Sequence, residues 1–265
     1  VCYQLPALLL PGMTLVISPL ISLMKDQVAA LTQAGVPAAF LNSSLEAEEY
    51  RDVYRRIRRG ECKLLYIAPE RLQAEGFRRL LQELPVSLVA VDEAHCVSQW
   101  GQDFRPSYLE IAGLVKSLPE RPTVGAFTAT ATAAVRRDIE ALLELRDPLR
   151  ITTGFDRPNL FFEVVRARDK DRWLRRFLAE RPEQSGIVYC ATRKTVDAVT
   201  ASLLAQGVPA ARYHAGMEDA ERRRSQEGFV YDQARVMVAT NAFGMGIDKS
   251  NVSFVVHYNM PKDLE

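Results

Sequence analysis

Two adjacent carboxylates follow an apolar run in the first half of the chain. Asp92 and Glu93 open the tetrapeptide Asp-Glu-Ala-His, which ends at His95 and comes directly after the run at 86–91, Val-Ser-Leu-Val-Ala-Val. A strand of a parallel sheet delivers its last side chains to the crevice where such folds bind ligands. There, one carboxylate can hold Mg²⁺ while its neighbour polarises an attacking water. The pattern indicates the acidic half of a nucleoside triphosphate hydrolysis site, and the alternative is a strand followed by a solvated acidic turn.

An aromatic-rich segment begins three residues after this tetrapeptide. Residues 98–105 read Ser-Gln-Trp-Gly-Gln-Asp-Phe-Arg, with Trp100 and Phe104 as the aromatic side chains. Each could stack on an unpaired base, an interaction worth ~1–3 kcal/mol. The alternative is packing in the core, but Gln99 and Gly101 deprive Trp100 of the apolar neighbours that a core position usually has.

Short hydroxyl side chains follow another apolar run, at 123–127. Thr128 and Thr130 are placed to bond to His95 or to the backbone. The alternative is an ordinary N-cap, from Thr130 or Thr132, for a helix at 133–143.

A glycine-rich turn near the end of the chain is a further candidate. Gly244 and Gly246 would let the backbone approach a ligand closely, and Asp248 could accept hydrogen bonds from a ribose hydroxyl. A glycine-rich turn between strands needs no ligand, however, so this motif alone is a weak signal.

The elements that must position these residues alternate between short apolar runs and helical stretches. Such a rhythm predicts an α/β fold with mainly parallel sheets flanked by helices. The expected strands lie at 14–17, 38–41, 63–67, 86–91, 123–127, 186–189, 210–213, 235–239 and 252–257.

An internal repeat divides the chain into two similar lobes. The pentapeptide Gly-Val-Pro-Ala-Ala at 35–39 recurs at 207–211, and the same offset of 172 residues superposes three of the expected strands. Turn-forming residues between 144 and 159 favour a boundary near residue 154, which gives lobes at 1–154 and 155–265. Only the first lobe carries the acidic pair, so we expect the second to close over a nucleotide held by the first.

Composition excludes several classes of protein. The formal net charge is +1, so any nucleic-acid binding must come from local grooves and loops. No apolar stretch reaches the length of a membrane span, and we expect no membrane partner. The four cysteines lack the spacing of a zinc site, so zinc is not expected, and a reduced, cytoplasmic chain is the simplest account. They are Cys2, Cys62, Cys96 and Cys190.

Together the motifs resemble those of superfamily 2 helicases and, more closely, of RecQ-type DNA helicases. The resemblance covers essentially the whole chain, and the segment at 98–106 is its most specific part. The motifs are Ser18-Pro-Leu-Ile-Ser-Leu-Met-Lys-Asp-Gln27, Tyr66-Ile-Ala-Pro-Glu-Arg-Leu72, Asp92-Glu-Ala-His95, His95-Cys-Val-Ser-Gln-Trp-Gly-Gln-Asp-Phe-Arg-Pro106, Phe127-Thr-Ala-Thr-Ala131, Phe155-Asp-Arg-Pro-Asn159 and Ala239-Thr-Asn-Ala-Phe-Gly-Met-Gly-Ile-Asp-Lys249.

The resemblance implies two RecA-like domains and a role for each candidate residue of the first lobe. Asp92 would hold Mg²⁺ through water, and Glu93 would orient and deprotonate the water that attacks the γ-phosphate of ATP. His95 would relay the nucleotide state to Thr128 and Thr130. The remaining residues would couple hydrolysis to single-stranded DNA or contact the DNA: Gln99, Trp100, Phe104 and Arg105.

In the second lobe, the resemblance implies that the turn at 240–248 contacts both DNA and ATP. Thr240 and Asn241 would contact DNA phosphate, whereas Gly244, Gly246 and Asp248 would lie on the ATP and ribose side. The implied activity is ATP-dependent unwinding of DNA with 3′ to 5′ translocation, in repair and recombination. The implied partners are single-stranded and partly duplex DNA, and the implied location is cytoplasmic and nucleoid-associated.

Two parts of the family pattern are expected outside residues 1–265. The phosphate loop should precede Val1, since no G-x-x-x-x-G-K-[ST] pattern occurs in the sequence, and an arginine-containing motif should follow Glu265. We therefore expect the 265 residues by themselves to be catalytically impaired. Two alternatives stay open: another superfamily 2 translocase, such as an RNA helicase, and a non-catalytic nucleic-acid-binding module.

Overall fold

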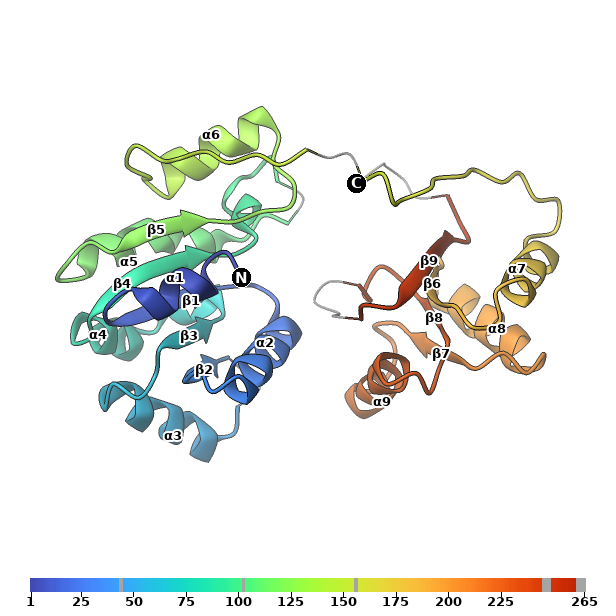
Figure 1. The fold of residues 1–265 in the computed structure, drawn as a ribbon, viewed down its shortest axis with the longest axis horizontal. Coiled ribbons are helices and arrows are strands. Elements are labelled where there is room, and N and C mark those ends of the chain that lie inside the picture. Colours follow the sequence, from blue (N-terminus) through green and yellow to red (C-terminus); the bar gives the residue numbers. More distant parts are fainter. Residues whose placement is uncertain (43–44, 102, 155–156, 245–248, 261–265) are drawn as a thin grey trace. The chain divides into compact units, whose positions relative to one another are not determined.

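Each half of the chain builds its own parallel β-sheet with helices packed on it (Figure 1). The computed structural model describes residues 1–42, 45–101, 103–154, 157–244 and 249–260, without the side chain of Ser22. The chain divides into two units, Val1–Thr153 and Gly154–Glu265. The expected fold class, α/β with parallel sheets flanked by helices, is confirmed.

Five strands form the sheet of the first unit, in the order β2-β3-β1-β4-β5. All the strand pairs are parallel. The strands are β1 (Met13–Ile17), β2 (Ala38–Leu41), β3 (Leu64–Ile67), β4 (Val86–Val91) and β5 (Thr123–Ala126). The helices are α1 (Gln4–Leu9), α2 (Ile21–Gln33), α3 (Ala47–Arg58), α4 (Glu75–Gln82), α5 (Glu110–Ser117) and α6 (Ala133–Leu142).

Both faces of the first sheet are buried, because successive side chains of a strand point to opposite faces. Leu15 and Ile17 of β1 join a core that includes buried side chains of α3, α4, α5 and α6. Val16 joins a second core with side chains of α1 and α2. Every residue of β1 is therefore buried, which is why the strand reads as a continuous apolar run.

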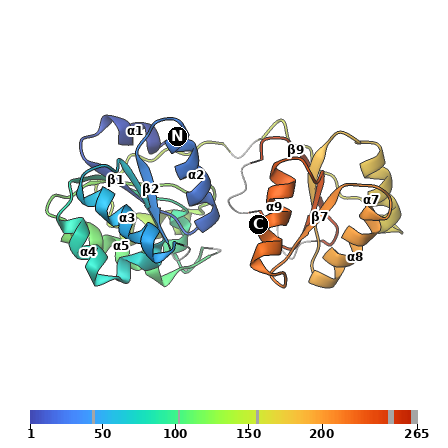
Figure 2. The same cartoon turned by 90° about the horizontal axis from the view of Figure 1, so that it is seen from below.

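The second unit repeats this design with four strands in the order β7-β8-β6-β9 (Figure 2). Val188 of β6 packs with α7 and α8, whereas Ile187 packs with Phe229 of α9. The strands are β6 (Ser185–Tyr189), β7 (Ala210–Tyr213), β8 (Val236–Ala239) and β9 (Val252–His257), and the helices are α7 (Lys170–Ala179), α8 (Arg193–Leu204) and α9 (Asp219–Val230).

The two sheets share the same strand register. Thr14 pairs with Leu64 in the first unit, and Gly186 pairs with Val236, both 172 residues later, in the second. One interior strand of each sheet also has a register irregularity, between residues 13 and 14 in β1 and between residues 185 and 186 in β6. The sequence repeat thus reflects a repeated architecture down to its irregularity.

Among the residues that the structure describes, no helix has the length and apolarity needed to cross a membrane.

Candidate active site

Three neighbouring strands of the first sheet end at the same edge, and each is followed by a polar residue. Ser18 follows β1, Asp92 follows β4, and Thr128 lies two residues after β5. Backbone hydrogen bonds continue past the strand ends. Asp92 N–H donates to the carbonyl of Ile17 in β1 at 2.8 Å, and Phe127 N–H donates to the carbonyl of Val91 in β4 at 2.8 Å. The carboxyl edge of this sheet therefore gathers the candidate residues, as parallel sheets of this class do.

The Asp92 carboxylate is held from the adjacent strand end. Ser18 Oγ donates to Asp92 Oδ2 at 3.0 Å, and Tyr108 Oη donates to the Asp92 backbone carbonyl at 2.8 Å. Burial raises the pKa of Asp92 above its ordinary value, and the Ser18 hydrogen bond opposes that rise only in part.

Glu93 has an unusual backbone conformation. Its φ of 45° and ψ of 47° lie in the left-handed region, which residues other than glycine rarely adopt. The next peptide is fixed because Ala94 N–H donates to Phe127 O at 2.9 Å, and a 3₁₀ turn at Ala94–Val97 follows. Burial, and then the neighbouring Asp92 charge, raise the pKa of Glu93.

His95 links Glu93 to Thr128. Its Nδ1 lies 3.3 Å from Glu93 Oε2 and 2.9 Å from Thr128 Oγ1. Because the Thr128 hydroxyl donates to Thr130 O at 3.0 Å, it must accept from His95, which places the imidazole proton on Nδ1. The structure thus brings Glu93, His95, Thr128 and the backbone of Thr130 into one chain of contacts, and the N-cap of α6 is Thr132.

The aromatic-rich segment at 98–105 directly follows the 3₁₀ turn that carries His95. Trp100 is 81% exposed and Gln99 is exposed, whereas Phe104 and Arg105 are partly buried. Arg105 donates twice to Asp103 Oδ2, at 3.0 and 2.9 Å. Gly101 packs so closely that an added Cβ would lie 2.4 Å from the His95 carbonyl oxygen. The loop that presents Trp100 is therefore built against the backbone of His95.

The second-unit candidates lie on the turn after β8. Thr240 N–H donates to Tyr213 O at 3.2 Å, and Asn241 is exposed. Gly244 has a φ of 137°, and an added Cβ would lie 2.4 Å from Tyr189 Oη, so glycine is required there. Gly246 and Asp248 lie outside the described residues.

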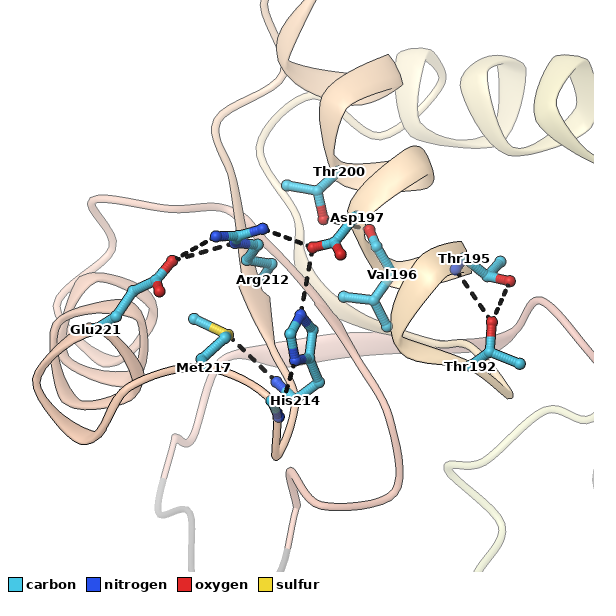
Figure 3. Close-up of polar contacts among 10 residues, drawn as sticks. Thr192, Thr195, Val196, Asp197, Thr200, Arg212, His214, Met217 and Glu221 are labelled. Carbon is cyan, nitrogen blue, oxygen red and sulfur yellow. Dashed lines mark hydrogen bonds and ion pairs between the residues drawn. The ribbon is translucent and has the colours of Figure 1, made fainter.

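A polar network around the end of β7 was not predicted from the sequence (Figure 3). Arg212 donates to Asp197 Oδ1 of α8 at 2.6 Å and to Glu221 Oε1 of α9 at 2.7 Å. The buried His214 lies 3.2 Å from the same Asp197 oxygen and accepts the Gly216 N–H on Nδ1. The sequence feature that could have indicated this network is Arg212, a charged residue within the short strand β7.

The donor set at Asp92 suits a hard divalent cation. The carboxylate and the Ser18 hydroxyl are both oxygen donors, the kind that Mg²⁺ prefers. Mg²⁺ commonly keeps most of its waters and binds through one or two carboxylates plus substrate phosphates. The described part of the chain contains no group of three or more His, Cys, Asp or Glu side chains that could hold a metal ion.

Comparison with known proteins places this geometry in a family. The profile of the family described as DEAD/DEAH box helicase matches residues 1–139, and that of the helicase conserved C-terminal domain matches residues 169–265. The chain belongs to the DEAD/DEAH box helicases.

The resemblance to RecQ-type helicases expected from the motifs is also confirmed. The chain is 50% identical to the ATP-dependent DNA helicase RecQ of Bacillus subtilis, with 100% of the chain and 45% of that protein covered. It is 47% identical to the RecQ of Haemophilus influenzae, with 100% and 42% covered. The chain thus spans less than half the length of these relatives.

A solved structure supports the fold. The DUF1998 helicase MrfA bound to DNA aligns with a TM-score of 0.74 at 17% identity, covering 98% of this chain and 39% of that one. At that identity the likeness shows the RecA-like fold alone.

Proposed function

We propose that this chain is the motor core of an ATP-dependent DNA helicase that couples ATP hydrolysis to 3′ to 5′ movement along single-stranded DNA. The observation that carries the proposal is the contact chain from Glu93 through His95 to Thr128, next to an exposed tryptophan. The similarity to the RecQ relatives supports DNA as the partner. We assign the two RecA-like domains to residues 1–154 and 155–265.

Glu93 is the proposed general base. Its carboxylate accepts a proton from the attacking water as the water oxygen bonds to the γ-phosphorus of ATP. The bond from that phosphorus to the bridging oxygen breaks, and ADP and phosphate leave. A raised pKa makes Glu93 a stronger base, and such assistance is worth ~10²- to 10⁴-fold.

Asp92 is the proposed holder of Mg²⁺, through a bound water. When present, the ion neutralises charge on the phosphate oxygens. Asp92 itself is held in place for this role because Ser18 donates a hydrogen bond to its Oδ2.

His95 and Thr128 are the proposed relay. A change at the Glu93 carboxylate, which lies 3.3 Å from His95 Nδ1, alters the hydrogen bond that this nitrogen makes with Thr128. Thr128 in turn bonds to the backbone of Thr130, ahead of α6, so the relay passes from a side chain to the start of a helix.

The proposed DNA contacts come from both units. Trp100 stacks on bases, with Phe104, Arg105 and Gln99 beside it in the same loop, whereas Thr240 and Asn241 bind phosphate. We assign Gly244, Gly246 and Asp248 to the ATP and ribose side. We also propose that the protein acts in the cytoplasm, in association with the nucleoid.

Binding of a fluorescein-labelled oligothymidine to the chain tests the DNA assignment. Trp100→Ala should weaken binding by about 5- to 150-fold, which corresponds to the loss of one stacked base. The matched control is Phe161→Ala, which removes another aromatic side chain that is 87% exposed and should leave binding unchanged. Unlabelled single-stranded DNA should compete better than RNA of equal length. Equal binding by Trp100→Ala, or better competition by RNA, would contradict the assignment.

A further inference from the structure

The hydroxyl of Ser98 is fully buried and has two partners. Ser98 Oγ donates to Asp138 Oδ2 of α6 at 2.6 Å and accepts the backbone N–H of Trp100 at 3.1 Å. Ser98 itself is 0% exposed. A hydroxyl removed from water is tolerated where its hydrogen bonds are made, so this serine is matched to Asp138 on one side and to the Trp100 backbone on the other.

The helix that carries Asp138 is fixed against the turn that carries His95. Val135 and Ile139 of α6 belong to the same core cluster as Ala94 and Val97. Because the positions flanking Asp138 along the helix surface are buried against the turn, α6 cannot shift without moving that turn.

Three hydrogen bonds join the segment at 93–101 to the segment at 127–142. Ala94 N–H donates to Phe127 O, and His95 Nδ1 contacts Thr128 Oγ1. Ser98 Oγ to Asp138 is the third, and of the three it alone bonds directly to the loop residue Trp100 through a shared atom.

We propose that Ser98 and Asp138 are positioning residues that fix the segment at 98–101, which carries Trp100, to α6. The stacking of a base on Trp100 is thereby transmitted to α6, the helix that follows Thr128. This inference rests on the proposed function. It adds a second route between DNA and the nucleotide side, which begins at the Trp100 backbone and reaches α6 without passing through His95.

The chemistry of the pair explains why these residue types are used. A carboxylate acceptor makes a short, charge-assisted bond, about twice as strong as one between neutral groups. Asparagine at position 138 would keep an acceptor for Ser98, whereas alanine would leave both the serine hydroxyl and the tryptophan N–H less well held. The two substitutions therefore separate the hydrogen bond from the charge.

Amide hydrogen exchange of the chain tests the proposal without needing hydrolysis. Asp138→Ala should speed exchange in peptides covering 98–101 by about tenfold or more, and Asp138→Asn should restore most of the protection. The matched control is Glu140→Ala, which removes another α6 carboxylate that pairs with Arg150 and should leave those peptides unchanged. Oligothymidine affinity should fall several-fold in Asp138→Ala and not in the control.

A second variant keeps the test decisive if Asp138→Ala loses its fold. Ser98→Ala removes the shared hydroxyl, and the double variant should be no worse than the more severe single variant, because both break one connection. Unchanged exchange at 98–101 in Asp138→Ala or Ser98→Ala would overturn the proposal. If the variants show the expected change in exchange but the wild-type chain binds no oligothymidine, the proposed function is overturned instead.

Discussion

Glu93 combines two unfavourable features in one residue. Its backbone is left-handed at φ 45°, and its carboxylate is partly removed from water beside a second carboxylate. Both features cost free energy in the folded state, and both occur at the edge where three strands end. Strain of this kind persists where the surrounding structure enforces it, and it often marks a functional site.

The backbone strain at Glu93 should be measurable as a difference in the free energy of unfolding between variants. Replacing Glu93 by glycine removes the steric penalty of the left-handed conformation, about 1–2 kcal/mol, whereas replacing it by alanine retains that penalty. We expect Glu93→Gly to be about 1 kcal/mol more stable than Glu93→Ala in urea unfolding. Because both variants lack the carboxylate, their difference isolates the backbone, and equal stability would refute the strained conformation.

The carboxylate of Asp92 should make stability fall as pH rises. Burial raises its folded-state pKa, so the folded chain binds this proton more tightly than the unfolded chain does. The stabilising contribution is therefore complete below the ordinary carboxyl pKa and is lost as pH rises through the raised value. Asp92→Asn should be more stable than wild type at pH 8, and less so as pH is lowered. The opposite trend in urea unfolding would show that Asp92 is stabilised as an anion.

At the scale of single residues, the sequence predicts which residues lie at the site better than it predicts their contacts. The adjacency of Asp92 and Glu93 after an apolar run was sufficient to predict their place at a strand end. The contact of Asp92 with Ser18 was not predicted, because it depends on β1 and β4 being neighbours although 68 residues separate the end of one from the start of the other. The left-handed Glu93 gave no signal, since glutamate does not favour that conformation.

Among the elements, fully buried strands were the easiest to predict. β1 and β4 are apolar nearly throughout because helices cover both faces of their sheet, and their predicted and observed bounds agree within one residue. β9 resembles β4 in sequence, with apolar residues at four of its six positions, yet it alternates between partly buried and exposed positions. Hydrophobic pattern alone could not separate these two environments, since it records residue type and not what covers the strand.

Arg212 shows how one side chain can hold two helices on a strand. It bonds to Asp197 of α8 and Glu221 of α9 from the middle of β7 (Figure 3). Arg212→Met keeps much of the aliphatic stem and removes both contacts. Since the Arg212 side chain is 41% exposed, we expect a loss of only about 1 kcal/mol, reduced at high salt.

The matched control for this change is Arg222→Met on α9. Among the described residues, Arg222 forms an ion pair with Asp219 of its own helix, three residues earlier. Its replacement should leave the urea midpoint of the second unit nearly unchanged. A similar loss in both variants would show that Arg212 acts through general charge and not through the connection between helices.

Across the whole molecule, one architecture appears twice and carries different chemistry. The registers of β1 with β3 and of β6 with β8 are the same, and β9 in the second sheet corresponds to β4 in the first. Where Asp92 follows β4, Tyr258 follows β9, and its Oη donates to Asp171 at 2.9 Å. The second unit therefore keeps the frame and lacks the acidic pair, as the sequence repeat predicts.

We propose that Glu93 activates water for ATP hydrolysis stimulated by single-stranded DNA. The direct measurement is ATP turnover by the protein that carries this chain, with and without oligothymidine, for wild type and Glu93→Gln. We predict stimulation in wild type and a loss of about 10²- to 10⁴-fold in the variant, with oligothymidine affinity retained. DNA-stimulated turnover by Glu93→Gln within twofold of wild type would show that Glu93 is not the general base.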